Sequence, residues 1–208
     1  YLTGGSGHTI GGSTAAGEGN LIAGNTNAGV EIAGASSSLV LGNQIGTNAA
    51  GTAARANNIG VLISSGDTNT IGGSAATEAN TISGNTTDGG KVLTGSGSVV
   101  RSNRIVTTPA GTAALANGGH GVTVTGASAI NTTIGSSTAG LGNMLSGNTG
   151  SGVYVSSNSG TQILGNQIGT NLTGDSALGN GGFGVLLDTG ANSNTIGGAA
   201  AARNQIAG

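Results

Sequence analysis

The chain has 208 residues, of which only 6% are Asp, Glu, Lys or Arg, against about 25% in an average globular protein. With two tyrosines, one phenylalanine and no tryptophan, it lacks the bulky aromatic side chains that fill a conventional two-layer core. A formal net charge of −2 and five scattered basic residues exclude a nucleic-acid or anionic-membrane surface, and no apolar run approaches the roughly 18 residues of a membrane span.

Pairs of aliphatic residues at alternate positions recur along the chain, such as Val30 with Ile32 and Val61 with Ile63. A period of two is typical of half-buried β-strands. The abundance of Gly, Ser, Thr and Asn would also fit a disordered linker, but the regular placement of Ile, Val and Leu predicts a folded, all-β chain.

Each predicted coil contains three short strands. The first follows a Gly-Val-x-Ile motif, which begins at Gly29, Gly60, Gly121, Gly152 and Gly184, with a degraded copy near Gly89. The second is centred on Ile10, Val40, Ile71, Val100, Ile134, Ile163 and Ile196. The third follows an Asn placed two residues before an aliphatic residue. The motifs return about every 31 residues, which predicts about seven coils.

Two coil types alternate, because the Thr-Ile-Gly-Gly motif returns only about every 62 residues. Coils with this motif have a long turn between the second and third strands, as in residues 74–79. The other coils have it after the third strand, as in residues 48–58. The segment 89–109 is irregular, since Gly90 replaces a core valine and Lys91, Arg101, Arg104 and Pro109 gather there.

Asparagine recurs in register with the coils. The position two residues before the aliphatic residue of the third strand is Asn20, Asn43, Asn80, Asn103, Asn143, Asn166 and Asn204. Three residues after that aliphatic residue the chain has Asn25, Asn48, Asn85, Asn148 and Asn171, with Thr108 in the fourth coil. Stacked amides can donate to one neighbour and accept from the next. We therefore predict that both sets form structural ladders.

These features predict a right-handed parallel β-helix, or β-solenoid, with three short strands per coil and about seven coils of ~31 residues. Glycines mark the tight corners between strands and do not match a phosphate-binding loop. Residues 1–208 are expected to form a single β-solenoid domain without recognisable caps.

The motifs Asn-Thr-Ile-Gly-Gly, Ser-Gly-Asn, Gly-Val-x-Ile and Gly-Asn-Gln-Ile-Gly-Thr-Asn cover the whole chain. They resemble the repeats of bacterial secreted and cell-surface right-handed β-helix proteins, which share a pectin-lyase-like β-solenoid. The resemblance implies the fold and an extracellular or cell-surface location. It does not choose between adhesive or structural proteins and polysaccharide enzymes.

Acidic side chains do not form an obvious catalytic or metal-binding cluster. Glu18 and Glu78 occupy the same turn two coils apart, roughly 10 Å, which is too far for a shared calcium ion. Glu31 belongs to a varied surface column that continues with Leu62 and Lys91. We predict no catalytic residue, no metal ligand and no cofactor, and hence no enzyme.

The other motifs do not indicate a specific activity either. His120 follows Arg104, the reverse of the order in the polygalacturonase signature, and is expected to be a turn residue. With only Tyr154 and Phe183 inside the chain, a carbohydrate groove is poorly supported. The threonines Thr9, Thr70, Thr133 and Thr195 recur only in every second coil and do not form an ice-binding row. Sequons at Asn85, Asn131 and Asn171 are expected by chance in this composition.

The sequence contains seven whole turns, so we expect either a window of a longer solenoid or subunits that stack end to end into a filament. The leading hypothesis is a non-catalytic extracellular or cell-surface rod that acts as a filament subunit, stalk or adhesin segment. The alternative is a carbohydrate-active enzyme or polysaccharide-binding module. Self-association and a surface polysaccharide are the expected partners, without nucleic acid or membrane insertion.

Overall fold

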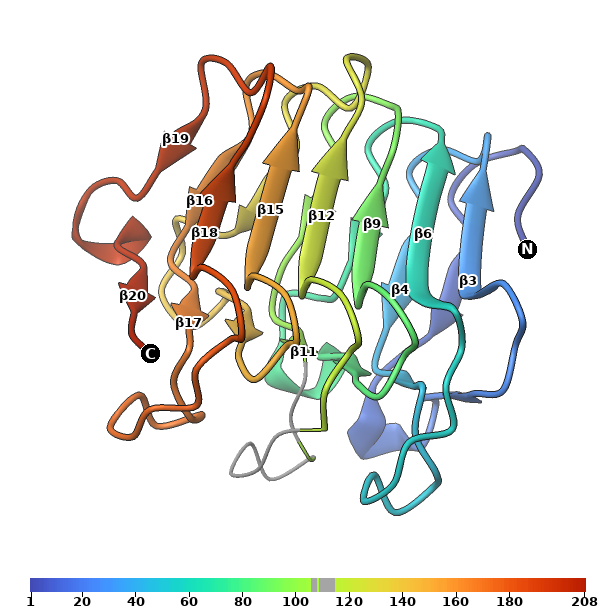
Figure 1. The fold of residues 1–208 in the computed structure, drawn as a ribbon. Helices are drawn as coiled ribbons and strands as arrows, with labels where there is room; N and C mark the ends of the chain where they lie inside the picture. Colours follow the sequence, from blue (N-terminus) through green and yellow to red (C-terminus); the bar gives the residue numbers. More distant parts are fainter. Residues whose placement is uncertain (106–107, 109–114) are drawn as a thin grey trace.

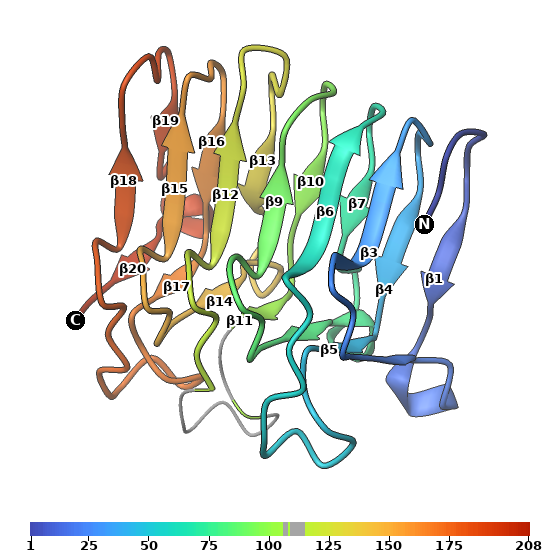
Figure 2. The same cartoon turned by 45° about the vertical axis from the view of Figure 1, so that its right-hand side comes forward.

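Aliphatic residues one coil apart stack on one another in the computed structural model, which describes residues 1–105, 108 and 115–208. The strands that carry them form three parallel sheets around one core (Figure 1). Figure 2 shows two of these sheets as the walls of the molecule and the third along its base. Val106, Thr107 and Pro109 of the irregular segment lie outside the described residues.

The strands are short, as the closely spaced corners require. Sheet one contains β1 (Thr9–Gly11), β4 (Leu39–Leu41), β7 (Thr70–Ile71), β10 (Val99–Val100), β13 (Thr133–Gly135), β16 (Gln162–Leu164) and β19 (Thr195–Ile196). Sheet two contains β2 (Leu21–Ile22), β5 (Gln44–Ile45), β8 (Thr81–Ile82), β11 (Arg104–Ile105), β14 (Met144–Leu145), β17 (Gln167–Ile168) and β20 (Gln205–Ile206). Sheet three contains β3 (Ala28–Ala33), β6 (Ile59–Ser65), β9 (Gly90–Val92), β12 (Val122–Thr125), β15 (Val153–Ser156) and β18 (Val185–Leu187).

The chain winds as a right-handed helix. In Figure 1 the strands of sheet three rise at the front, and the chain returns behind them while advancing from the N-terminus to the C-terminus. Sheets one and two each have seven strands, whereas sheet three has six, because Leu2 contributes only an isolated bridge to Ile32. The predicted all-β parallel solenoid with three strands per coil is confirmed, and the stack makes about six complete turns.

The core consists of columns of Ile and Val with equivalent positions in successive coils. In sheet one, Val40 pairs with Ile71, Ile71 with Val100 and Val100 with Ile134, and none of these side chains is exposed. Full burial of such a side chain stabilises the fold by about 1.5–3 kcal/mol relative to an exposed one. Because each coil buries only its contacts with its neighbours, stability accumulates along the axis.

The corners between strands depend on glycine. Gly72, which follows β7, has φ +91°, and a Cβ atom at this position would overlap the carbonyl oxygen of Arg101 in the next coil. Only glycine reaches this conformation without steric cost while letting two backbones approach so closely. The irregular coil nevertheless keeps its register, since Gly90 pairs with Val61 on one side and Val122 on the other.

The long turns of the Thr-Ile-Gly-Gly coils contain short 3-10 helices, namely η1 (Thr14–Ala16), η2 (Ala76–Glu78) and η3 (Ala200–Ala202). In the other coil type, the turn after the third strand closes on itself through antiparallel bridges from Thr47 to Ala54 and from Thr170 to Ala177. The predicted alternation of turn positions is confirmed for these turns.

Candidate functional site

The first asparagine ladder runs along the corner between sheets one and two. From Asn20 to Asn204, each side-chain Nδ2 donates to the Oδ1 of the next member, at 2.8 to 3.1 Å. Nδ2 also reaches a backbone carbonyl of sheet one, as in the 2.7 Å bond from Asn80 to Val40. All seven predicted members take part, so this ladder is confirmed.

A second ladder runs along the corner between sheets two and three, but its membership differs from the prediction. Its members are Asn25, Asn57, Asn85, Asn117, Asn148 and Asn180, joined by Nδ2 to Oδ1 bonds of 2.8 to 3.3 Å. The prediction was correct for Asn25, Asn85 and Asn148. It was wrong for Asn48 and Asn171, and Asn117 takes the place given to Thr108.

Asn48 and Asn171 shape the long turns instead. The Oδ1 of Asn48 accepts the backbone N–H groups of Thr52 and Ala53, and Asn171 does the same for Asp175 and Ser176. The long turn lies between the third strand and the ladder corner. A count of three residues forward from that strand therefore ends inside the turn, before the ladder position.

The missed members carry a signal in the sequence. Asn57, Asn117 and Asn180 lie three or four residues before the first glycine of the Gly-Val-x-Ile motif or its degraded copy, as Asn25, Asn85 and Asn148 also do. Counting backward from Gly60, Gly121 and Gly184 therefore finds the three members that the forward count missed. The reason is that the long turn is already closed at that point, so its length no longer shifts the register.

A group of aromatic and ionisable side chains that contact one another lies on the outward face of sheet three. The His120 ring stacks on Tyr154, with ring centroids 4.7 Å apart and an interplanar angle of 13°. The Tyr154 hydroxyl donates to Asp188 Oδ2 at 3.0 Å. Three residues from successive coils, separated by about 34 residues at each step in the sequence, thus form one connected cluster.

His120 is held by its neighbours on both sides. Its backbone N–H donates to Asp88 Oδ1 at 2.9 Å, and its Nδ1 accepts the backbone N–H of Ser151 at 2.9 Å. Asp88 also forms an ion pair with Lys91, with 3.7 Å between Oδ2 and Nζ. Since Nδ1 is an acceptor, a neutral His120 carries its proton on Nε2.

Asp188 is the exposed carboxylate of this cluster. The backbone N–H of Thr189 lowers the pKa of Asp188, and the hydroxyls of Tyr154 and Thr189 lower it further. Hydrogen bonds to the charged form favour ionisation, so Asp188 carries a full negative charge at neutral pH.

Two other acidic side chains, Glu18 and Glu78, accept hydrogen bonds from the backbone of their own turns. Glu18 accepts the backbone N–H of Ser13 at 2.8 Å, and Glu78 accepts those of Ser74 at 2.7 Å and Ala75 at 3.0 Å. These backbone hydrogen bonds lower the pKa of Glu78, with Ser74 contributing most. Each carboxylate is engaged within its own loop, as expected for turn caps rather than a shared ion site.

The structure separates the residues that resembled a polygalacturonase signature. His120 lies before β12 on sheet three, whereas Arg104 lies on sheet two and lines a shallow cavity of about 340 Å³ together with Met144 and Gln167. Glu31 accepts hydrogen bonds from Ser64 at 3.1 Å and Asn27 at 3.2 Å.

Three further surface features that the sequence singles out have the following positions in the structure. Across sheet one the threonines alternate with Leu39, Val99 and Gln162, so no continuous threonine row forms. The sequon residue Asn85 is buried in the second ladder, whereas Asn131 is exposed. Within residues 1–105, 108 and 115–208, no three His, Asp or Glu side chains are grouped closely enough to hold a metal ion.

Comparison with known proteins finds no matching family model, no matching curated protein and no matching solved structure. No helix among the described residues is long and apolar enough to cross a membrane.

Proposed function

We propose that this chain is a non-catalytic structural protein, a rigid β-solenoid rod of the extracellular space or cell surface that associates end to end. Such a rod serves as a filament subunit, stalk or adhesin segment. The repeat motifs, which resemble those of secreted and surface β-helix proteins, support the location. The polarity of the two asparagine ladders is the observation that carries the mode of assembly.

Both ladders run in one direction. Every interior Nδ2 donates toward the C-terminal coil, so each Oδ1 receives its hydrogen bond from the N-terminal side. Within the described part of the chain, Asn20 Oδ1 accepts no hydrogen bond, and Asn204 Nδ2 donates only to the Ile163 carbonyl at 2.7 Å. The second ladder ends in the same way at Asn25 and Asn180. One end thus offers acceptors and the other offers donors.

This polarity selects the orientation of an end contact. A C-terminal coil against an N-terminal coil places Asn204 Nδ2 opposite Asn20 Oδ1, whereas a head-to-head contact would place two oxygens together. A head-to-tail contact is heterologous, so it can repeat without closing and produces an open filament.

The end coils also expose apolar side chains and strand edges that interior coils cover. Ile196 is 47% exposed and Ile206 50% exposed, whereas their interior equivalents Ile71 and Ile82 are fully buried. Strands β1, β2, β19 and β20 each pair with a neighbour on one side only. Such edges and apolar surfaces favour pairing with a further coil, either of a second subunit or of a longer solenoid.

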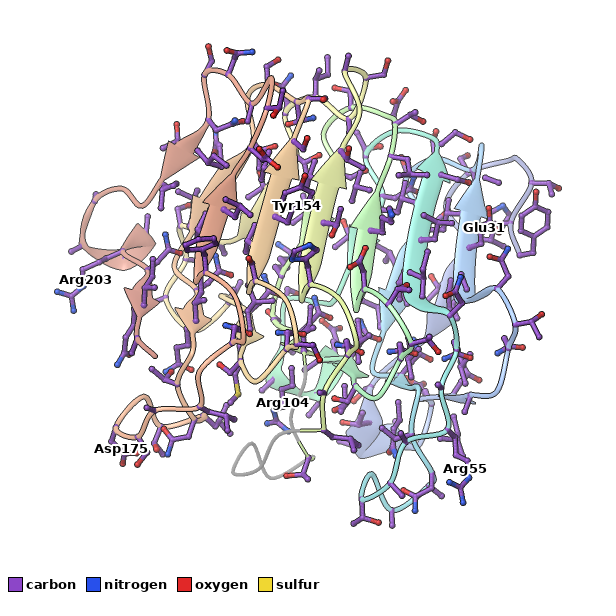
Figure 3. The ribbon with its side chains drawn as sticks, in the orientation of Figure 1. Glu31, Arg55, Arg104, Tyr154, Asp175 and Arg203 are labelled. Carbon is purple, nitrogen blue, oxygen red and sulfur yellow. The ribbon has the colours of Figure 1, made fainter. Side chains whose placement is uncertain are left out.

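Charged side chains near the two ends favour the same head-to-tail contact. Glu18 follows η1 at one end, and Arg203 follows η3 at the other, each within two residues of its first-ladder asparagine. Figure 3 shows Arg203 extending from the C-terminal end of the molecule. In a head-to-tail stack with coils about 4.8 Å apart, these opposite charges lie close to one another.

The test compares assembly of the wild-type chain with two variants by sedimentation velocity and cryo-electron microscopy. Wild type is expected to form rods that lengthen with concentration and show an unbroken layer spacing near 4.8 Å. Ile206→Asp places a charge in the end contact and is expected to remain monomeric. Leu172→Asp, at a similarly exposed position in a lateral turn (39%), is expected to assemble normally. Monomers of wild type at every concentration, or rods of Ile206→Asp, would refute end-to-end assembly.

A further inference from the structure

Two asparagines of the second ladder are followed directly by glycine. Asn117 and Asn180 begin the same sequence, Asn-Gly-Gly-x-Gly-Val, and no other asparagine of the chain precedes a glycine. In an Asn-Gly pair no side chain hinders the glycine nitrogen, which can therefore reach the asparagine Cγ. Because the two sites share their local sequence, a difference in reactivity between them in the folded chain comes from the structure.

The close approach of successive coils requires these glycines. A Cβ atom at Gly118 would lie 2.2 Å from the carbonyl oxygen of Thr86, and one at Gly181 would lie 2.4 Å from that of Thr149. Both distances are too short for a side chain of any kind. The packing of the coils therefore places a chemically reactive dipeptide at this corner of the solenoid.

The ladder holds both reacting groups of the Asn117–Gly118 pair. Asn117 is fully buried, and its Oδ1 accepts the backbone N–H and the Nδ2 of Asn85 at 3.0 and 2.9 Å. Its Nδ2 donates to the Ile82 carbonyl at 3.2 Å and to Asn148 Oδ1 at 3.3 Å. The Gly118 N–H donates to the Asn85 carbonyl at 2.9 Å. The amide of Asn117 thus has a ladder neighbour on each side.

Asn180 has a ladder neighbour on one side only. Its Oδ1 accepts two hydrogen bonds from Asn148, at 2.8 and 3.0 Å. Within the part of the chain that the structure describes, its Nδ2 donates only to the Leu145 carbonyl, at 3.0 Å. Asn180 is half-buried and Gly181 is exposed, although the Gly181 N–H still donates to the Asn148 carbonyl at 2.8 Å.

The strand that follows Asn180 is also less covered than its interior equivalent. Strand β18 pairs with β15 only, whereas β12 pairs with both β9 and β15 (Figure 1). Leu187 of β18 is 39% exposed, whereas Val124 in the same column of β12 is fully buried. Segments with few buried contacts open locally at the smallest cost in free energy. The Gly181 nitrogen is therefore released from its hydrogen bond more often than the Gly118 nitrogen.

We propose that Asn180 is a site of spontaneous deamidation in the folded chain, whereas the ladder protects Asn117. The Gly181 nitrogen attacks Asn180 Cγ, the Cγ–Nδ2 bond breaks, and Nδ2 leaves as ammonia with the proton of the Gly181 amide. Water then opens the resulting succinimide ring at one of its two carbonyl carbons, which produces aspartate or isoaspartate. The net reaction consumes one water molecule and releases one ammonia molecule.

Both products disturb the junction between β15 and β18. In the aspartate product, a carboxylate oxygen replaces Nδ2 and faces the Leu145 carbonyl, so that two acceptors meet. The isoaspartate product adds a methylene group to the main chain directly before the turn into β18. Each product also adds one negative charge to a chain whose formal net charge is −2. Deamidation is thus a slow, irreversible step that loosens this coil.

The experiment incubates the 208-residue chain in mildly alkaline buffer and follows both sites by peptide mass spectrometry. Asn180 is expected to convert at least about tenfold faster than Asn117, because the rate scales with the fraction of time for which each site is open. In concentrated urea, which removes the ladder, the two sites should convert at equal rates. This unfolded sample is the matched control for their intrinsic chemistry.

The Asn180→Asp variant, which has the sequence of the aspartate product, tests the consequence. It should melt at a lower temperature than wild type, and at a higher temperature than Asn117→Asp, whose carboxylate lies in the buried part of the ladder. The comparison uses dilute protein that is monomeric by sedimentation velocity, so its outcome does not depend on end-to-end assembly. Equal rates at the two sites of the folded chain would overturn the proposal. So would an unchanged Asn180 after the time in which the unfolded chain converts completely.

Discussion

The buried asparagines at the corners make the hydrogen bonds to backbone and side-chain groups that water would otherwise make. In the interior of the first ladder, Asn103 Nδ2 donates to Asn143 and to the Ile71 carbonyl, and its backbone N–H bonds to Asn143 as well. Removing one amide therefore leaves several buried groups without partners. At neighbouring positions, the same residue type can instead fold a surface turn, as Asn48 does.

The ladder role and the turn role of asparagine predict different losses of folding stability when the residue is replaced by alanine. Asn57→Ala should destabilise the chain by about 2–3 kcal/mol, because Asn25 loses its acceptor and Asn85 loses its donor in a buried corner. Asn48→Ala should cost about 1 kcal/mol or less, since water can replace its turn hydrogen bonds. Urea unfolding of the two variants measures the difference, and equal losses would contradict the assignment of Asn57 to the ladder.

Among the structural elements, the η2 turn shows how a single carboxylate can organise a loop. Glu78 gathers two backbone N–H groups and the Ser74 hydroxyl at one oxygen. Across the intervening coil, Thr14 donates to the Thr77 carbonyl at 3.0 Å, which joins the η1 and η2 turns. Turns of the same type therefore support one another along the axis.

This turn predicts a pH dependence. The pKa of Glu78 is lowered by its backbone hydrogen bonds, so its contribution to stability is present above the unfolded pKa, about 4.3, and is lost as pH falls through the lower folded value. Glu78→Gln should lower the melting temperature slightly at pH 7, and the difference from wild type should shrink below about pH 4. Ser74→Ala, which removes only the 3.3 Å hydroxyl bond, should retain the pH dependence. A difference for Glu78→Gln that stays constant from pH 7 to pH 3 would rule out this role.

Across the whole molecule, the exposure of equivalent core residues depends on how many neighbouring coils cover them. Ile71 and Ile196 occupy the same Thr-Ile-Gly-Gly motif and the same core column, yet Ile71 is fully buried and Ile196 is 47% exposed. In a stack of repeats, each coil is stabilised by its neighbours, so a coil with a neighbour on one side only is less stable than a coil with neighbours on both sides.

A matched pair of substitutions tests this gradient. Ile71→Ala should cost about 2–5 kcal/mol, the usual range for a buried isoleucine, whereas Ile196→Ala should cost clearly less in the monomer. If subunits stack end to end, the cost of Ile196→Ala should rise with protein concentration while that of Ile71→Ala stays constant. Thermal melts across a concentration series provide the measurement. Equal costs in dilute solution would show that the end coil is as well packed as the interior.

The fold and the first ladder could be predicted because a repeat places the same residue in the same environment many times. The Asn before each third strand recurs without an intervening turn of variable length, so its register survives from Asn20 to Asn204. The alternation of Val and Ile marked the core columns for the same reason. Period and polarity are local properties, and sequence by itself determined them.

Only the tertiary structure decided which residues of different coils meet. The long turns vary in length, which displaced the predicted second ladder to Asn48 and Asn171, and the amides of Asn57 and Asn180 were found in their place. His120, Tyr154 and Asp188 form one cluster although each belongs to a different coil. Side chains that face outward are not constrained by the packing of the core, so no periodic pattern in the sequence predicts their contacts. Only the stacking of the coils brings them together.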